Sequence, residues 1–262
     1  MDLQLVDKTV LVTGGSKGIG LACAMAFAKE GARVAIVSRD AGNLERATEA
    51  MGAEGLEVAT FVADLCDSKL ARSMVAAVEA QLGPIDILVN SAGAANRTPA
   101  AELTAQHWHA AMDAKYFTYI HAMDAVLPRM VQVGGGVIVN IVGMGGKQAN
   151  PVHLAGGAAN AALMLASAGL GNAFAGKNIR VVAVNPSATV TERLKEGNAA
   201  EARLAGATPE ETLAKKTKQH PMGRFAEPRE IADVVVFLAS KRASYVNGAV
   251  LSLDGGGAPI VI

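Results

Sequence analysis

Short runs of apolar, β-branched residues recur along the chain, separated by longer segments in which apolar residues follow helical spacing. This alternation is typical of repeated strand–helix–strand units, whose parallel strands are buried on both faces. It predicts an α/β fold with a doubly wound, seven-stranded parallel sheet and helices on both faces. The predicted strands are Thr9–Val12, Arg33–Ser38, Glu57–Val62, Ile85–Asn90, Val137–Val142, Arg180–Asn185 and Ala249–Leu253, and the predicted helices are Gly20–Glu30, Ala41–Met51, Ser68–Leu82, Thr104–Met130, Val152–Phe174 and Pro228–Ala239.

One stretch, from Glu192 to Met222, interrupts the alternation because it is polar and rich in Lys and Ala. Ligands of doubly wound sheets bind beyond the carboxyl ends of the strands, so an insertion after the sixth predicted strand is well placed to cover a substrate. No repeat and no Pro/Gly/Ser-rich linker divides the chain. We therefore predict a single domain over residues 1–262 with a substrate lid at about 192–222.

The balance of charge narrows the classes of partner. Lys plus Arg and Asp plus Glu number 24 each, so no overall field attracts nucleic acid or an anionic membrane. The N-terminus lacks a basic segment followed by a long apolar run, and no stretch reaches the length needed to cross a bilayer. The only cysteines, Cys23 and Cys66, read as free thiols. We expect a cytoplasmic protein that acts on a small molecule.

A glycine-rich turn, TVLVTGGSKGIG, connects the first predicted strand to the first predicted helix. Glycines at 14, 18 and 20 permit a tight turn in which backbone N–H groups and a helix N-terminus approach a pyrophosphate. The turn predicts a dinucleotide site in a Rossmann-type sheet, with a purely structural turn as the alternative.

The end of the second predicted strand carries a clue to the choice of dinucleotide. Ser38 and Arg39 stand where an acidic residue would bind the ribose hydroxyls of NAD and a basic residue would accept the 2′-phosphate of NADP. Lys17 in the glycine turn adds a second positive charge. These residues favour NADP(H) over NAD(H), unless Arg39 is an ordinary solvated charge.

The ordered motifs TGGSKGIG, VADLCD, NSAG, VIVNI, VVAVNP, PMGRFAEPREIA and YVNGAVLSLDGG resemble the classical short-chain dehydrogenase/reductase family over essentially the whole chain. The resemblance implies that Asp64 contacts the adenine, that Asn90 supports the sheet near the cofactor, and that Thr191 meets the nicotinamide carboxamide. One departure is Pro186-Ser187, where the family usually has Pro-Gly. The cofactor-binding residues expected from the turn, the second strand and the resemblance are Gly14, Ser16, Lys17, Gly18, Ile19, Gly20, Ser38, Arg39, Asp64, Leu65, Asn90, Ala92, Gly93, Pro186 and Thr191.

The catalytic residues that the resemblance implies do not appear at their expected places. The family uses a tyrosine as proton carrier, a lysine that lowers its pKa, a serine on the reacting oxygen and an asparagine that helps to hold a water. Alignment places His153, Gly157, Gly143 and Lys115, respectively, at these positions. A shifted register does not restore the set, because no tyrosine occurs between 119 and 245 and no serine between 91 and 167.

Three interpretations of this substitution stay open. In the first, the protein is an oxidoreductase for a carbonyl or alcohol substrate, with His153 as proton donor and Lys115 as the nearby cation. In the second, the same two residues serve non-redox chemistry. In the third, the chain is a nucleotide-holding pseudo-enzyme or partner subunit. The histidines, cysteines and carboxylates show no metal-ligand spacing, so no metal is predicted.

Two further segments suggest how the chain meets its partners. The small-residue helix 155–171 and the apolar C-terminal segment GGGAPIVI favour a homodimer or homotetramer, unless that segment folds back on its own subunit. The lid carries cations that suit either an anionic substrate or a solvated helix: Arg193, Lys195, Lys215, Lys216 and Lys218.

Overall fold

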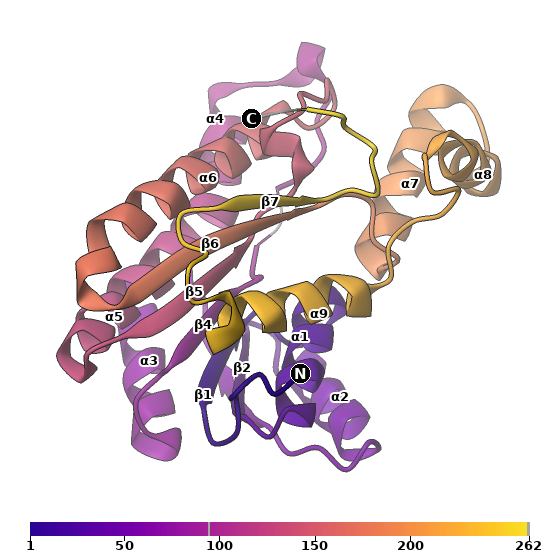
Figure 1. Ribbon diagram of the computed structural model, residues 1–262. Coiled ribbons are helices and arrows are strands. Elements are labelled where there is room, and N and C mark those ends of the chain that lie inside the picture. Colours follow the sequence, from indigo (N-terminus) through magenta and orange to yellow (C-terminus); the bar gives the residue numbers. More distant parts are fainter. Residues whose placement is uncertain (94, 261–262) are drawn as a thin grey trace.

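The computed structural model describes residues 1–93 and 95–260. Within them, seven strands form one parallel sheet in the order β3-β2-β1-β4-β5-β6-β7, which confirms the predicted doubly wound architecture (Figure 1). The order reverses between β1 and β4, and in open α/β sheets ligands bind at such a switch point. The strands are β1 (Thr9–Thr13), β2 (Arg33–Ser38), β3 (Ala59–Val62), β4 (Ile87–Asn90), β5 (Gly136–Ile141), β6 (Ile179–Pro186) and β7 (Val250–Leu253).

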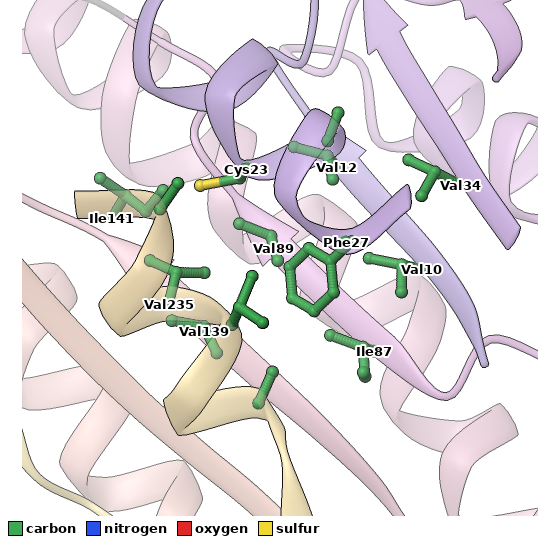
Figure 2. Close-up of a cluster of buried hydrophobic side chains, with 14 of the residues drawn as sticks. Val10, Val12, Cys23, Phe27, Val34, Ile87, Val89, Val139, Ile141 and Val235 are labelled. Atoms are coloured by element: carbon green, nitrogen blue, oxygen red, sulfur yellow. The ribbon is translucent and has the colours of Figure 1, made fainter. Parts of the chain in front are cut away.

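The core lies in two layers because alternate side chains of each strand face opposite sides of the sheet. Val10 and Val12 face one layer, where they pack with Phe27 and the neighbouring side chains shown in Figure 2. Leu11 faces the other layer. Helices α1 (Gly18–Lys29), α2 (Ala41–Gly52) and α9 (Pro228–Ala239) cover the first face, whereas α3 (Ser68–Leu82), α5 (Thr118–Val133) and α6 (Leu154–Phe174) cover the second.

The expected helix Thr104–Met130 is divided. It consists of α4 (Ala105–Ala111), a π-helical segment at Met112–Phe117, and α5. A π turn inserts one extra residue and changes the direction in which the following side chains point, and such turns are frequent at functional sites. Lys115 lies inside this segment. The single-helix prediction was therefore wrong at this point, since helical spacing of apolar residues carries no mark of the extra residue.

The segment predicted as a lid forms two helices, α7 (Glu192–Ala205) and α8 (Pro209–Gln219), which stand apart from the sheet beyond β6 (Figure 1). The Thr191 side chain accepts a hydrogen bond from Leu194 N–H and caps α7. Thr208 and Glu211 form a reciprocal capping box at the start of α8. These caps explain where α7 and α8 begin. The role of the two helices as a lid stays a prediction.

One expectation about the chain needs correction. Among the described residues, a single helical stretch, Leu154–Lys177, is long and apolar enough to cross a bilayer by length and composition alone. The helix α6 within it packs on β6 and gives Ala159, Leu163 and Ser167 to the buried interior. Its apolar character therefore fits a helix that covers a sheet on one side.

Candidate active site

A row of buried polar side chains crosses the sheet below the carboxyl ends of the strands. Thr13 Oγ1 donates to Asn90 Oδ1 at 3.1 Å, Asn90 Nδ2 donates to Asn140 Oδ1 at 2.9 Å, and Asn140 Nδ2 donates to Ser167 Oγ at 2.9 Å. Because buried polar groups are costly without partners, this connected row holds β1, β4, β5 and α6 in register. The structure places Asn90 within this support.

The glycine turn packs directly against the loop that follows β4. A Cβ on Gly14, whose φ is +65°, would lie 2.7 Å from Ala92 Cα, and a Cβ on Gly20 would lie 2.2 Å from the Gly14 carbonyl oxygen. Only glycine allows both approaches. Within the described chain no side chain caps α1, so its first N–H groups are left for a ligand.

The far side of this turn faces α7. A Cβ on Gly18 would meet only the Thr191 side chain, 3.4 Å away at Cγ2. Ser16 is buried in the turn, Lys17 is exposed at its edge, and Ile19 is half-buried. Pro186, the buried last residue of β6, precedes the segment that leads to Thr191. An uncapped helix N-terminus behind a glycine turn fits the pyrophosphate of a dinucleotide.

The residues expected at the adenosine end also gather beyond β2 and β3. Arg39 is exposed immediately after Ser38, the half-buried last residue of β2. Asp64 Oδ1 accepts a hydrogen bond from Cys66 N–H at 3.0 Å, and the intervening Leu65 is buried. Burial raises the pKa of the Cys66 thiol, and the Arg39 charge opposes that rise, so the guanidinium lies near this turn.

Lys115 points inward from the π-helical segment and does not reach out to water. Its Nζ donates to Tyr119 Oη at 2.7 Å and to the Ile141 carbonyl oxygen, at the end of β5, at 3.1 Å. Tyr119 Oη in turn donates to the same carbonyl at 2.6 Å. Gly93 makes the arrangement possible, because a Cβ there would lie 2.2 Å from the Ala114 carbonyl oxygen.

Burial of the Lys115 amine changes its chemistry. Burial, and then the positive charge of Arg193, lowers the pKa of Lys115 to about 7. Burial raises the pKa of Tyr119, which keeps that phenol protonated at neutral pH. Lys115 is therefore the group of the pair that exchanges a proton near neutrality.

His153 lies at the entrance of α6, across the loop that follows β5. A Cβ on Gly145 would lie 3.2 Å from the Cδ2 atom of His153, and a Cβ on Gly156 would lie 2.1 Å from its Cε1 atom. The imidazole ring therefore packs between these two glycines. Its Nδ1 is buried and has no hydrogen-bond partner among the described residues. Burial, followed by the charges of Arg97, Arg193 and Lys115, lowers the pKa of His153 to about 4. The imidazole is thus neutral at pH 7, contrary to the expectation that it titrates near neutrality.

Gly143 and Gly157 stand where the family has its serine and its lysine, and the backbone conformation or contacts of each disfavour a side chain. Gly143 has a φ of +126°, and its N–H donates to Asn185 Oδ1 at 3.2 Å, so this N–H is already used within the protein. A Cβ on Gly157 would lie 2.7 Å from the Gly145 carbonyl oxygen. Side chains at either position would require the backbone to move.

Two site residues, Asn160 and Arg97, were not recognised from the sequence, and Arg193 was named only as one of several cations of the predicted lid. Asn160 is buried on α6, and its Nδ2 lies 3.3 Å from the point that a Cβ on Gly143 would occupy. Its spacing of seven residues from His153 puts both on one helix face, a signal that was available. Arg193 of α7 donates to the carbonyls of Gly93 and Ala95 at 3.2 and 3.3 Å, and Arg97 pairs with Glu201 of α7. These long-range contacts have no local sequence signal.

The sequence profile of a family described as enoyl-(acyl carrier protein) reductase matches residues 14–257. The chain belongs to the short-chain dehydrogenase/reductase family. It is 36% identical to D-threitol dehydrogenase from Mycolicibacterium smegmatis over 97% of this chain and 94% of that protein. Members of the family are NAD(P)-dependent oxidoreductases that act on alcohols and ketones.

Solved short-chain dehydrogenase/reductase structures share the fold throughout. The structure of L-sorbose reductase from Gluconobacter frateurii, complexed with NADPH and L-sorbose, superposes with a TM-score of 0.92 at 30% identity and full coverage of both chains. NAD⁺-bound xylitol dehydrogenase superposes with a TM-score of 0.91 at 26% identity, covering 97% of this chain and 100% of that one. Relatives therefore use either dinucleotide, and the family alone does not decide between NADP(H) and NAD(H).

Proposed function

We propose that this chain is an NAD(P)-dependent oxidoreductase that interconverts an alcohol and a carbonyl compound without the family's Ser/Tyr/Lys set, using Lys115 as its proton carrier. One observation carries the proposal: a buried lysine at the carboxyl end of β5, bonded to Tyr119 and to Ile141. No carboxylate of the described residues lies within ion-pair distance of its Nζ. Such a lysine can lose its proton near neutral pH.

The proton step follows from the two states of this amine. In the oxidation, neutral Lys115 Nζ accepts the hydroxyl proton of the substrate, and in the reduction, the ammonium returns it to the carbonyl oxygen. The glycine turn and the N-terminus of α1 would hold the dinucleotide, which would supply or accept the hydride. The roles expected from the sequence are thereby exchanged, since His153 is the neutral group and Lys115 the titrating one.

His153 and Asn160 serve to position the substrate oxygen. His153 directly precedes α6 and Asn160 lies on it, and both side chains border the loop around Gly143 and Gly145. The neutral imidazole and the amide each offer a hydrogen-bond donor. Asn160 thus supplies, close to Gly143, the kind of contact that the family's serine supplies elsewhere.

The test is direct. Purified protein is titrated with NADPH and NADH by calorimetry, and a panel of polyols, hydroxy acids and matching ketones is then screened for absorbance change at the nicotinamide band. We expect micromolar dinucleotide binding and turnover of at least one substrate pair. Tight binding without any turnover would overturn the proposal in favour of a dinucleotide-holding pseudo-enzyme.

Within this proposal, NADP(H) is preferred over NAD(H), because Arg39 is exposed beyond β2 and near the Asp64 turn. Arg39→Asp is expected to weaken NADPH binding by about 10- to 100-fold, the effect of losing a charge-assisted contact to phosphate, and to leave NADH binding unchanged or tighter. Calorimetry measures both. Arg46→Asp, on the next helix, is the matched control, and equal loss of both dinucleotides in Arg39→Asp would contradict the preference.

The proposal also includes a homodimer or homotetramer. The outer face of α6 carries the exposed residues Ala158, Ala161, Leu165 and Gly169, and Leu165 is 78% exposed. A small-residue stripe around one large apolar side chain suits close packing of a second helix. Leu165→Glu is expected to give monomers in light scattering, whereas Val6→Glu, at another exposed apolar position, is expected to leave the oligomer intact. Unchanged mass for Leu165→Glu would place the interface elsewhere.

The C-terminal segment and the location of the protein in the cell complete the proposal. Of the apolar C-terminal segment, Val261 and Ile262 lie outside the described residues. The free cysteines Cys23 and Cys66 support a cytoplasmic location, where thiols stay reduced.

A further inference from the structure

Several cations lie close to one another at this site. Arg97 belongs to the loop after β4, Arg193 of α7 donates to the Gly93 and Ala95 carbonyls of the same loop, and Lys115 donates to the Ile141 carbonyl at the end of β5. Arg193 and Lys115 each lower the pKa of His153, and Arg193 also lowers that of Lys115, so the three groups are close enough to act on one another.

In the described part of the chain, the carboxylate whose charge acts on Arg193 is Glu196, and it lies beyond ion-pair distance. Arg97 has a partner in Glu201, which it shares with Lys216. Arg193 and Lys115 have none within ion-pair distance and donate only to carbonyl and hydroxyl oxygens. Two like charges held near each other without a counter-ion destabilise the free protein and favour binding of an anion.

A second observation concerns a polar atom of the same group. The buried Nδ1 of His153 has no hydrogen-bond partner among the described residues. Buried polar atoms in folded proteins are nearly always bonded, and an exception calls for a partner that the protein itself does not contain. This atom belongs to the same group of side chains as Lys115 and Arg193.

We infer that the substrate carries a carboxylate, which Arg193 holds at the mouth of the site while its hydroxyl or carbonyl oxygen reaches Lys115. The substrate class is thus a hydroxy acid and the matching oxo acid. The inference rests on the proposed oxidoreductase function. It adds that the substrate has a carboxylate, bound by Arg193, besides its reacting oxygen.

The hydrogen bonds that Arg193 makes to the backbone suit it to bind a carboxylate. Two of its N–H groups are used by the carbonyls of Gly93 and Ala95, which fix the guanidinium plane, and its remaining N–H groups can pair with a carboxylate. It sits in the first turn of α7, two residues after Thr191.

The experiment compares matched acid and neutral substrates. Wild type, Arg193→Gln and the control Arg203→Gln, an exposed arginine farther along α7, are assayed with 3-hydroxybutyrate against 2-butanol and with D-gluconate against D-glucitol. We expect the wild type to prefer the acid of at least one pair. Arg193→Gln should raise KM for that acid by about 30- to 1,000-fold more than KM for its neutral partner, while Arg203→Gln behaves as wild type.

A binding measurement separates this inference from the proposed reaction. The same two acids are titrated by calorimetry into each protein with saturating NADP⁺, where no turnover is required. Binding that Arg193→Gln abolishes, in a protein without turnover, would uphold the acid site and overturn the oxidoreductase proposal. Turnover of neutral alcohols by the wild type, with no binding of either acid, would overturn the acid site and leave the oxidoreductase proposal standing.

Discussion

Lys115→Met is expected to lower kcat by about a thousandfold in both directions of the reaction, because a positioned proton carrier contributes about 10²- to 10⁴-fold. Methionine keeps the length of the side chain and removes its proton. Dinucleotide binding should stay within about threefold of wild type, since the glycine turn lies on the other side of the switch point. Stopped-flow turnover and calorimetry measure the two quantities.

Lys115→Arg distinguishes a proton carrier from a fixed charge. Arginine keeps the positive charge but cannot give up its proton near neutral pH, so it should be as inactive as Lys115→Met. In wild type, reduction should slow as pH rises through about 7, where the ammonium is lost, and oxidation should quicken. Tyr119→Phe should keep most of the activity. Activity restored by Lys115→Arg, or a pH profile unchanged in Lys115→Met, would rule out the proton role.

The same lysine makes the free energy of unfolding depend on pH. Its pKa is about 7 in the folded protein against an ordinary value of 10.5, so between these values the unfolded chain binds the additional proton. Stability should therefore rise with pH across this window, with a slope of up to about 1.4 kcal/mol per pH unit. Below pH 7 both states are protonated and the destabilisation is present in full. Urea denaturation of Lys115→Met should lack this slope.

Much of the fold could be predicted because local signals marked it. The bounds of α3 and α9 agree with the prediction at both ends, and each helix begins with a polar cap: Asp67 accepts from the first turn of α3, and Glu227 with Glu230 forms a capping box at α9. The central strands were recognisable as β-branched runs buried on both faces. At β3 the prediction began two residues early, because Glu57 and Val58 continue the pattern but make no ladder.

The site was predicted less completely, for a physical reason. The glycine turn and the position of Lys115 follow from sequence order, but the direction of the Lys115 side chain depends on a π turn. The partners of Arg193 lie about a hundred residues away in sequence, and those contacts exist only after the sheet has assembled. The pKa of His153 could not be anticipated either, because burial and three cations from distant segments lower it.

Restoring the family's lysine by Gly157→Lys should destabilise the protein rather than create the usual catalytic set. The new Cβ would lie 2.7 Å from the backbone carbonyl of Gly145, and a backbone atom cannot turn aside as the end of a side chain can. We expect a loss of about 1–3 kcal/mol, the usual range for overpacking with backbone displacement, and hence a melting temperature lower by roughly 2–12 °C.

Gly52→Lys is the matched control, at the last residue of α2 and away from the proposed subunit interface. A Cβ at Gly52 meets nothing within 4 Å, so replacing glycine there should be neutral or stabilise the helix by about 0.5–1 kcal/mol. Thermal and urea denaturation of the two variants isolate the contact with Gly145. If Gly157→Lys were as stable as Gly52→Lys and more active than wild type, the loop around Gly145 would be free to move.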